Sequence, residues 1–277
     1  MNRTRALLLA TAVPLLIVLG VLVSATLGGD DEPEPAVTAV SSAGRPSSTR
    51  SIVPGAEQIS VGRGARRATI FRRPAAAGAA GPVVVFLHGW LAVDPAFYAP
   101  WIAHLVRRGA TVIYPTYQEA PYLDTVSPLP NTLVALRLAF ERVPVAPGRL
   151  VVAGHSAGGA LAADYAASAR AAGLPVPAVV FSAYPGRSLR GIPLRIPPVS
   201  AHNIAAGTKV YVLAGSDDRV VGTRTARTIA RTATRAAVTL RLVRDPRADD
   251  HGAPQRAGPA SRRVFWAPLD RLIAATP

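Results

Sequence analysis

Short apolar runs alternate along this chain with segments of helical spacing, and this alternation limits the folds open to it. The apolar runs occupy residues 82–89, 110–117, 149–154, 178–185, 209–216 and 237–245. The spacing predicts helices over residues 97–108, 131–143, 157–173, 223–237 and 260–275, the last interrupted near Pro268. Strands that alternate with helices form a mostly parallel sheet with helices on both faces, so we expect an α/β fold.

Residues 57–61 and 68–72 predict a strand pair in front of the first apolar run. In parallel sheets, functional groups gather beyond the carboxyl ends of the strands. Four segments follow strands in this way: HGW (88–90), GHSAGG (154–159), GSDDRVV (215–221) and the loop after LRLVRD (240–245). A functional site is expected where they meet.

The N-terminal part of the 277-residue chain predicts a membrane segment. Residues 6–29 carry no charged side chain, follow two arginines and precede the acidic stretch DDEPEP. A bilayer core needs about 20 apolar residues. The flanking charges place the N-terminus in the cytoplasm, so we expect an anchor at the cell membrane with the remaining chain outside the cytoplasm. The alternative is a signal peptide cleaved after Ala25, which would give a secreted protein.

Composition divides the remainder into a linker and one folded domain. Residues 30–56 are rich in Pro, Ser, Ala and Thr, which is typical of flexible linkers. The folded domain is therefore expected over residues 57–277. The sequence leaves its oligomeric state open.

Several function classes are disfavoured. The chain has no cysteine, which excludes disulfides and cysteine nucleophiles. Its five histidines lack metal-ligand spacing, so we predict no metal and no cofactor. The net charge of +15 comes almost wholly from arginine, but no compact run of basic and aromatic residues indicates a nucleic-acid module.

The motif G-x-S-x-G occurs at residues 154–158, between a predicted strand and a predicted helix. A sharp strand-to-helix turn there would expose the hydroxyl of Ser156 above the sheet, and the small glycines would avoid collisions around it. Ser156 is therefore the candidate nucleophile. The backbone N–H of Ala157, together with that of Trp90 in the HGW turn, is the predicted pair of donors for an oxyanion.

A serine nucleophile needs a base, usually a histidine held by a carboxylate. Only His251 lies after the last strand, whereas His155 is expected to point away from the neighbouring hydroxyl. Asp218 is the predicted acid because it lies on the turn beyond the preceding strand. The adjacent Asp217 is the alternative.

These segments, in this order, resemble the α/β-hydrolase family over residues 57–275. The resemblance implies Ser156 as nucleophile, Asp218 as orienting acid, His251 as base, and Trp90 and Ala157 as oxyanion donors. Members similar to this chain act as esterases, lipases, dienelactone-type hydrolases or thioesterases without a cofactor. Unlike many members, the chain has only a short, proline-rich interval at 186–207 where a helical cap would lie, which implies a lightly covered site.

The resulting hypothesis is a hydrolase of small-molecule or lipid esters, or of thioesters, that works through an acyl-enzyme. The alternatives are an acyltransferase of the same fold and a non-catalytic cell-envelope binding protein.

The sequence leaves open the roles of two further features. Arg224, Arg227, Arg231 and Arg235 share one helical face, which is either solvated or turned toward anionic lipid. The tyrosine-rich residues 114–124 either line the substrate pocket or form an ordinary loop.

Overall fold

A computed structural model describes residues 51–74, 81–188 and 194–277. The predicted membrane segment and most of the predicted linker lie outside these residues. Within the described ranges, no helix combines the length and the apolar character that a membrane crossing requires.

The fold is built on one eight-stranded sheet with the strand order β1-β2-β4-β3-β5-β6-β7-β8. β2 runs antiparallel to β1 and β4, and the remaining neighbours are parallel. The strands are β1 (Glu57–Val61), β2 (Ala68–Arg72), β3 (Val83–Leu87), β4 (Thr111–Pro115), β5 (Leu150–His155), β6 (Val179–Ala183), β7 (Lys209–Gly215) and β8 (Ala237–Val243). Each predicted strand is present, and the sheet is mostly parallel as expected.

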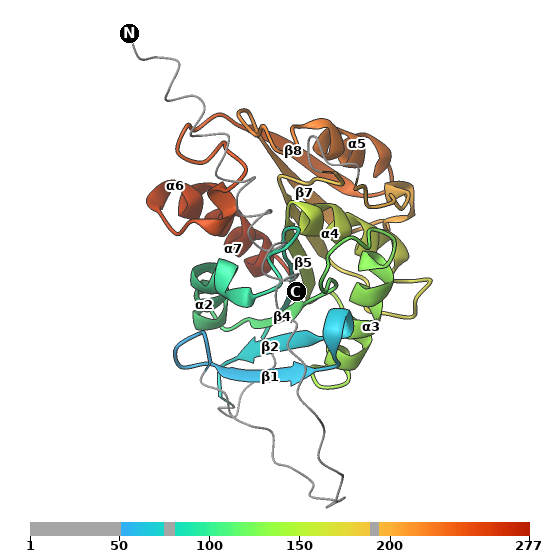
Figure 1. Cartoon of the computed structure of the whole chain (residues 1–277), viewed down its shortest axis with the longest axis vertical. Helices are drawn as coiled ribbons and strands as arrows, with labels where there is room; N and C mark the ends of the chain where they lie inside the picture. The colour runs from blue at the N-terminus through green and yellow to red at the C-terminus, as the bar shows by residue number, and fades with distance from the viewer. Residues whose placement is uncertain (1–50, 75–80, 189–193) are drawn as a thin grey trace, which may run out of the picture. The chain divides into compact units, whose positions relative to one another are not determined.

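Helices cover both faces of this sheet (Figure 1). One face packs against α3 (Pro128–Phe140), α4 (Ala157–Ser168) and α5 (Arg224–Thr232). The other packs against α2 (Ala99–Arg107) and a C-terminal segment made of α6 (Pro259–Ser261), the π-helix η5 (Arg262–Trp266) and α7 (Ala267–Ala274). Central strands such as β3 are buried along their whole length because helices cover them on both sides.

Alternate residues of the central strands enter different cores. In β3, Val83, Val85 and Leu87 join the core beneath α3 and α4, whereas Val84 and Phe86 join the core beneath α2. This period of two, repeated in neighbouring strands, explains why the strands read as unbroken apolar runs in the sequence.

Several helix boundaries differ from the prediction. α3 begins at Pro128 rather than at residue 131, because proline suits the first helical position, where no backbone N–H is needed. Asn131 does not cap this helix; its side chain donates to Tyr117 O at 3.4 Å. α4 ends at Ser168 rather than at residue 173, and the chain turns at Gly173 with a φ of +64°.

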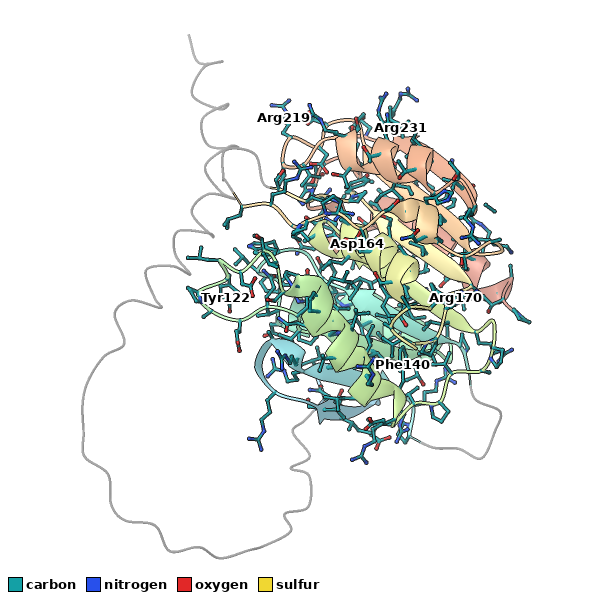
Figure 2. All side chains as sticks on the ribbon, turned by 90° about the vertical axis from the view of Figure 1, so that its right-hand side faces the viewer. Tyr122, Phe140, Asp164, Arg170, Arg219 and Arg231 are labelled. Atoms are coloured by element: carbon teal, nitrogen blue, oxygen red, sulfur yellow. The ribbon has the colours of Figure 1, made fainter. Side chains whose placement is uncertain are left out.

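Two further differences concern the last elements. α5 ends at Thr232, so Arg235 lies outside the helix and does not share its basic face. The arginines that remain on α5 are exposed, and Arg231 projects away from the sheet in Figure 2. Near the C-terminus, Pro268 is accommodated by the π-helical turn that precedes α7.

Candidate active site

Ser156 lies at the apex of the turn from β5 into α4. Its backbone has φ 58° and ψ −121°, a strained conformation for a residue with a side chain. A Cβ added at Gly154 would lie 2.2 Å from Gly158 O, and one added at Gly158 would lie 2.1 Å from Leu87 O. Glycine at 154 therefore allows this elbow, residues 154–158, to close on itself, and glycine at 158 allows it to pack against the end of β3.

The three residues predicted from separate strand ends form one hydrogen-bonded chain. His251 Nε2 lies 3.0 Å from Ser156 Oγ, and His251 Nδ1 lies 2.8 Å from Asp218 Oδ2. With Nδ1 donating to the carboxylate, Nε2 presents its lone pair to the serine hydroxyl. The arrangement can remove a proton from the hydroxyl.

Asp218 rather than Asp217 is the carboxylate that contacts His251. The Asp218 side chain is fully buried, and its Oδ1 accepts the N–H groups of Val220 and Val221, each at 3.0 Å. Both carboxylate oxygens therefore have partners, which fixes the orientation of the group. Asp217 is 57% exposed and pairs with Arg219 instead.

The two backbone N–H groups predicted as oxyanion donors belong to residues that line the cleft beside Ser156. Among the described residues, neither the N–H of Ala157 nor that of Trp90 donates to a protein acceptor. Ala157 is the first residue of α4, where the helix leaves N–H groups without intrahelical partners. Both residues line the same cleft as Ser156.

The predicted oxyanion loop, residues 88–91, which carries Trp90, is held from several sides. His88 O accepts the N–H of Gly158 at 2.9 Å and also the hydroxyl of Tyr117. Gln118 Oε1 accepts the N–H of Leu91, a residue with φ 70°, at 3.1 Å. Burial lowers the pKa of His88 to about 4, so its imidazole is neutral near pH 7 and stacks on Tyr117. The loop is thus fixed to the segment that follows β4 and to the elbow before any substrate arrives.

A family model described as alpha/beta hydrolase fold matches residues 84–240. This match covers more than half of the chain and includes most of β3, the elbow and the turn that carries Asp218. The chain belongs to the α/β-hydrolase family. None of the curated proteins compared with this α/β-hydrolase matches it.

Solved structures with the same fold include several esterases. Esterase B from Lactobacillus rhamnosis is 16% identical, with a TM-score of 0.62 over 81% of this chain and 87% of that one. A thermostable esterase from Pseudomonas putida ECU1011 is 21% identical, with a TM-score of 0.62 over 83% and 86%. One of two fungal esterases from Rhizomucor miehei is 19% identical, with a TM-score of 0.61 over 79% and 83%. At these identities the likeness concerns the fold.

The cleft of this α/β-hydrolase is narrow and mostly apolar. It has a water-accessible volume of about 20 Å³. Its lining comes from the oxyanion loop, the loop between β4 and α3, the elbow, the interval after β6 and the turn after β7: Trp90, Thr125, Ser156, Ala157, Gly186, Arg187, Ser188, Leu194, Ile196 and Val221. Tyr114 and Tyr117 are buried behind the oxyanion loop, so these two tyrosines of the 114–124 segment do not line the cleft.

The short interval after β6 is anchored where a cap would otherwise begin. Arg187 pairs with Asp164 of α4 at 2.7 Å, and Val199 N–H donates to the same carboxylate at 3.2 Å. Ser188 and Arg195 form an isolated antiparallel bridge. The described part of this interval contains only the 3-10 helix η3 (Ala201–Asn203), which accords with a lightly covered site.

Tyr98 and His155 are buried beside the site but do not stand out in the sequence as candidates. His155 points away from the Ser156 hydroxyl, as expected, and its two ring nitrogens contact Tyr98 Oη and His251 O. A buried tyrosine in a helical segment resembles any core residue, so only the tertiary contacts reveal it. Across the described residues, no group of His, Asp or Glu side chains is arranged to hold a metal ion.

Proposed function

We propose that this α/β-hydrolase is a serine hydrolase of carboxylic esters or thioesters. The observation that carries the proposal is the hydrogen-bonded chain from Ser156 through His251 to Asp218 beside two unoccupied backbone N–H groups. A non-catalytic descendant of the fold would have no physical need for a strained serine aligned with a histidine base.

In the first half of the reaction, Ser156 Oγ attacks the substrate carbonyl carbon as its proton passes to His251 Nε2. The Asp218 carboxylate keeps the Nδ1–H of the resulting imidazolium in place and stabilises its charge. The carbonyl oxygen becomes an oxyanion, and the N–H groups of Trp90 and Ala157 donate to it. Collapse of this intermediate breaks the bond to the alcohol or thiol, which leaves with the proton from Nε2, and an acyl-enzyme remains.

In the second half, His251 takes a proton from water while the water oxygen attacks the acyl carbon. The same two N–H groups stabilise the second oxyanion. Its collapse releases the carboxylic acid and returns the proton to Ser156 Oγ. The cycle therefore needs neither a metal nor an organic cofactor.

The deciding experiment is covalent labelling with a fluorophosphonate, which reacts with activated serines. The wild-type protein should be labelled, and the variants S156A and H251A should not be. A matched control is S216A, because Ser216 also lies at a strand end but bonds to Asp249. A wild-type protein that fails to label would support the non-catalytic binding protein instead.

Turnover then separates hydrolysis from acyl transfer. A panel of p-nitrophenyl esters of increasing chain length, with matching thioesters, should yield free carboxylic acid. If the acyl group goes to an added alcohol in preference to water, the protein is an acyltransferase of this fold.

We further propose that residues 6–29 anchor the domain at the cell membrane, outside the cytoplasm. The uncharged segment between arginines and the acidic stretch supports this topology. Fractionation of cells that express the full chain should recover it with membranes, and added protease should reach the domain from outside the cytoplasm. A soluble extracellular product that begins after Ala25 would instead identify a cleaved signal peptide.

A further inference from the structure

A buried chain of hydrogen bonds runs behind the candidate site. Gly89 N–H donates to Tyr98 Oη at 3.0 Å, and Tyr98 Oη lies 2.8 Å from His155 Nδ1. On its other side, His155 Nε2 lies 2.9 Å from the backbone oxygen of His251. The chain thus connects the loop that carries Trp90 with the loop that carries the base.

The directions of these hydrogen bonds follow from the available donors. Gly89 N–H can only donate, and the His251 carbonyl can only accept. His155 must therefore carry its proton on Nε2, which leaves Nδ1 to accept the Tyr98 hydroxyl proton. One neutral tautomer satisfies every contact in the chain.

The surroundings keep this tautomer neutral. Tyr98 is 1% and His155 2% exposed, and burial lowers the pKa of His155 well below its ordinary value. The positive charge of a protonated His251 acts in the same direction, since the two rings lie 4.8 Å apart. A neutral neighbour matters here because a second cation would oppose the imidazolium that forms during the reaction.

Packing alone does not account for the arrangement. Tyr98 lies at the end of the 3-10 helix η2 (Pro95–Tyr98), directly beyond the oxyanion loop, and packs on Phe86 with ring centroids 5.0 Å apart. A phenylalanine could make that ring contact equally well. The hydroxyl bridges Gly89 and His155, whose polar groups would otherwise be buried without this partner, and it also contacts the Gln255 side chain.

We infer that Tyr98 and His155 are positioning residues, which hold the oxyanion loop and the His251 loop in register through this bridge. The inference rests on the proposed hydrolase function. Neither residue reaches the reacting atoms, so each acts through the groups it holds. Catalysis is sensitive to such placement, because a displacement of about 1 Å can cost about 100-fold in rate.

The test compares Y98F with Y165F by kinetics on a p-nitrophenyl ester. Tyr165 is an equally buried tyrosine whose hydroxyl donates to Pro175 O at 2.8 Å, far along α4 from the site. Both variants lose one buried hydroxyl, so their thermal stabilities should fall by similar amounts. Y98F should lose about 10- to 100-fold in kcat with KM changed less than twofold, whereas Y165F should keep wild-type kcat.

Two more measurements separate positioning from general damage. The affinity for a trifluoromethyl ketone, which forms a tetrahedral adduct with serine, should fall in Y98F by the same factor as kcat/KM. H155L should lose as much activity as the double variant Y98F/H155L, because both break one chain. H155Q, which can still offer an N–H to His251 O, should recover part of the H155L loss.

The outcomes distinguish the two proposals. A wild-type protein that neither labels nor hydrolyses would refute the hydrolase function and the positioning role together. An active wild type with an equally active Y98F would refute the positioning role alone. Equal kcat losses in Y98F and Y165F would also overturn it, since the effect would then be a general cost of a missing hydroxyl.

Discussion

Replacing Arg187 with methionine should lower the free energy of unfolding, because it leaves a buried carboxylate without its ion-pair partner. Arg187 donates to both oxygens of Asp164 at 2.7 Å, and the two side chains are 11% and 1% exposed. In the variant, the carboxylate keeps the Val199 N–H at 3.2 Å as its donor among the described residues. Breaking one half of a buried ion pair leaves an uncompensated charge, so the free energy of unfolding should fall by about 3–5 kcal/mol near pH 8.

The loss in the free energy of unfolding caused by R187M should be larger at high pH than at low pH. Burial raises the pKa of Asp164, and Arg187 opposes that rise, so R187M should raise the folded-state pKa further. The unfolded-state pKa stays near its ordinary value of about 3.9. A carboxyl whose pKa rises on folding binds protons more tightly when folded, so its stabilisation is lost as pH increases through the folded-state pKa. Wild-type Asp164 also has a raised pKa, so R187M should regain up to about 1.4 kcal/mol per pH unit relative to wild type as pH falls from the folded-state pKa of the variant to that of wild type.

Urea unfolding at pH 8 and pH 5, at constant ionic strength, measures both effects. The control is D164N/R187M, which has no buried charge and still offers an oxygen to Val199 N–H. Its stability should lie within about 1–2 kcal/mol of wild type, with no added pH dependence. A loss below about 1 kcal/mol for R187M at pH 8, or the same loss at both pH values, would refute the reasoning.

Three further substitutions test the site. D218N should lower kcat by about 10⁴-fold with little change in KM, because the amide no longer holds His251 in the required tautomer, while D217N should match wild type in the same assay. G158A should lower kcat by about 100-fold. The new Cβ would lie 2.1 Å from the nearest backbone oxygen, so the elbow would have to move away from the oxyanion loop. An unchanged kcat would contradict this packing. V221A should widen the cleft, which Val221 lines, and raise kcat/KM for butyrate relative to acetate esters by about tenfold, as measured on p-nitrophenyl esters. An unchanged ratio would show that Val221 does not limit the length of the acyl group.

The order of strands and helices could be predicted from the sequence because its signals are local. Period-two burial makes central strands apolar throughout, and helix spacing separates them. The elbow could also be predicted from the sequence, because a strained turn between strand and helix requires glycine on both sides of Ser156. Helix ends were less predictable: α3 begins at Pro128 and α5 ends before Arg235, because neighbouring turns and packing override weak local preferences.

The amino-acid sequence by itself determined the fold class and the chain order of the three candidate catalytic residues. Only the tertiary structure decided that Asp218 is buried against His251 while Asp217 lies in solvent, and that Tyr98 and His155 bridge two loops. His251 meets Ser156 across 95 residues of chain and Asp218 across 33. Such contacts depend on how whole strands register in the sheet and on which side chains burial then forces together, and no short stretch of sequence encodes that information.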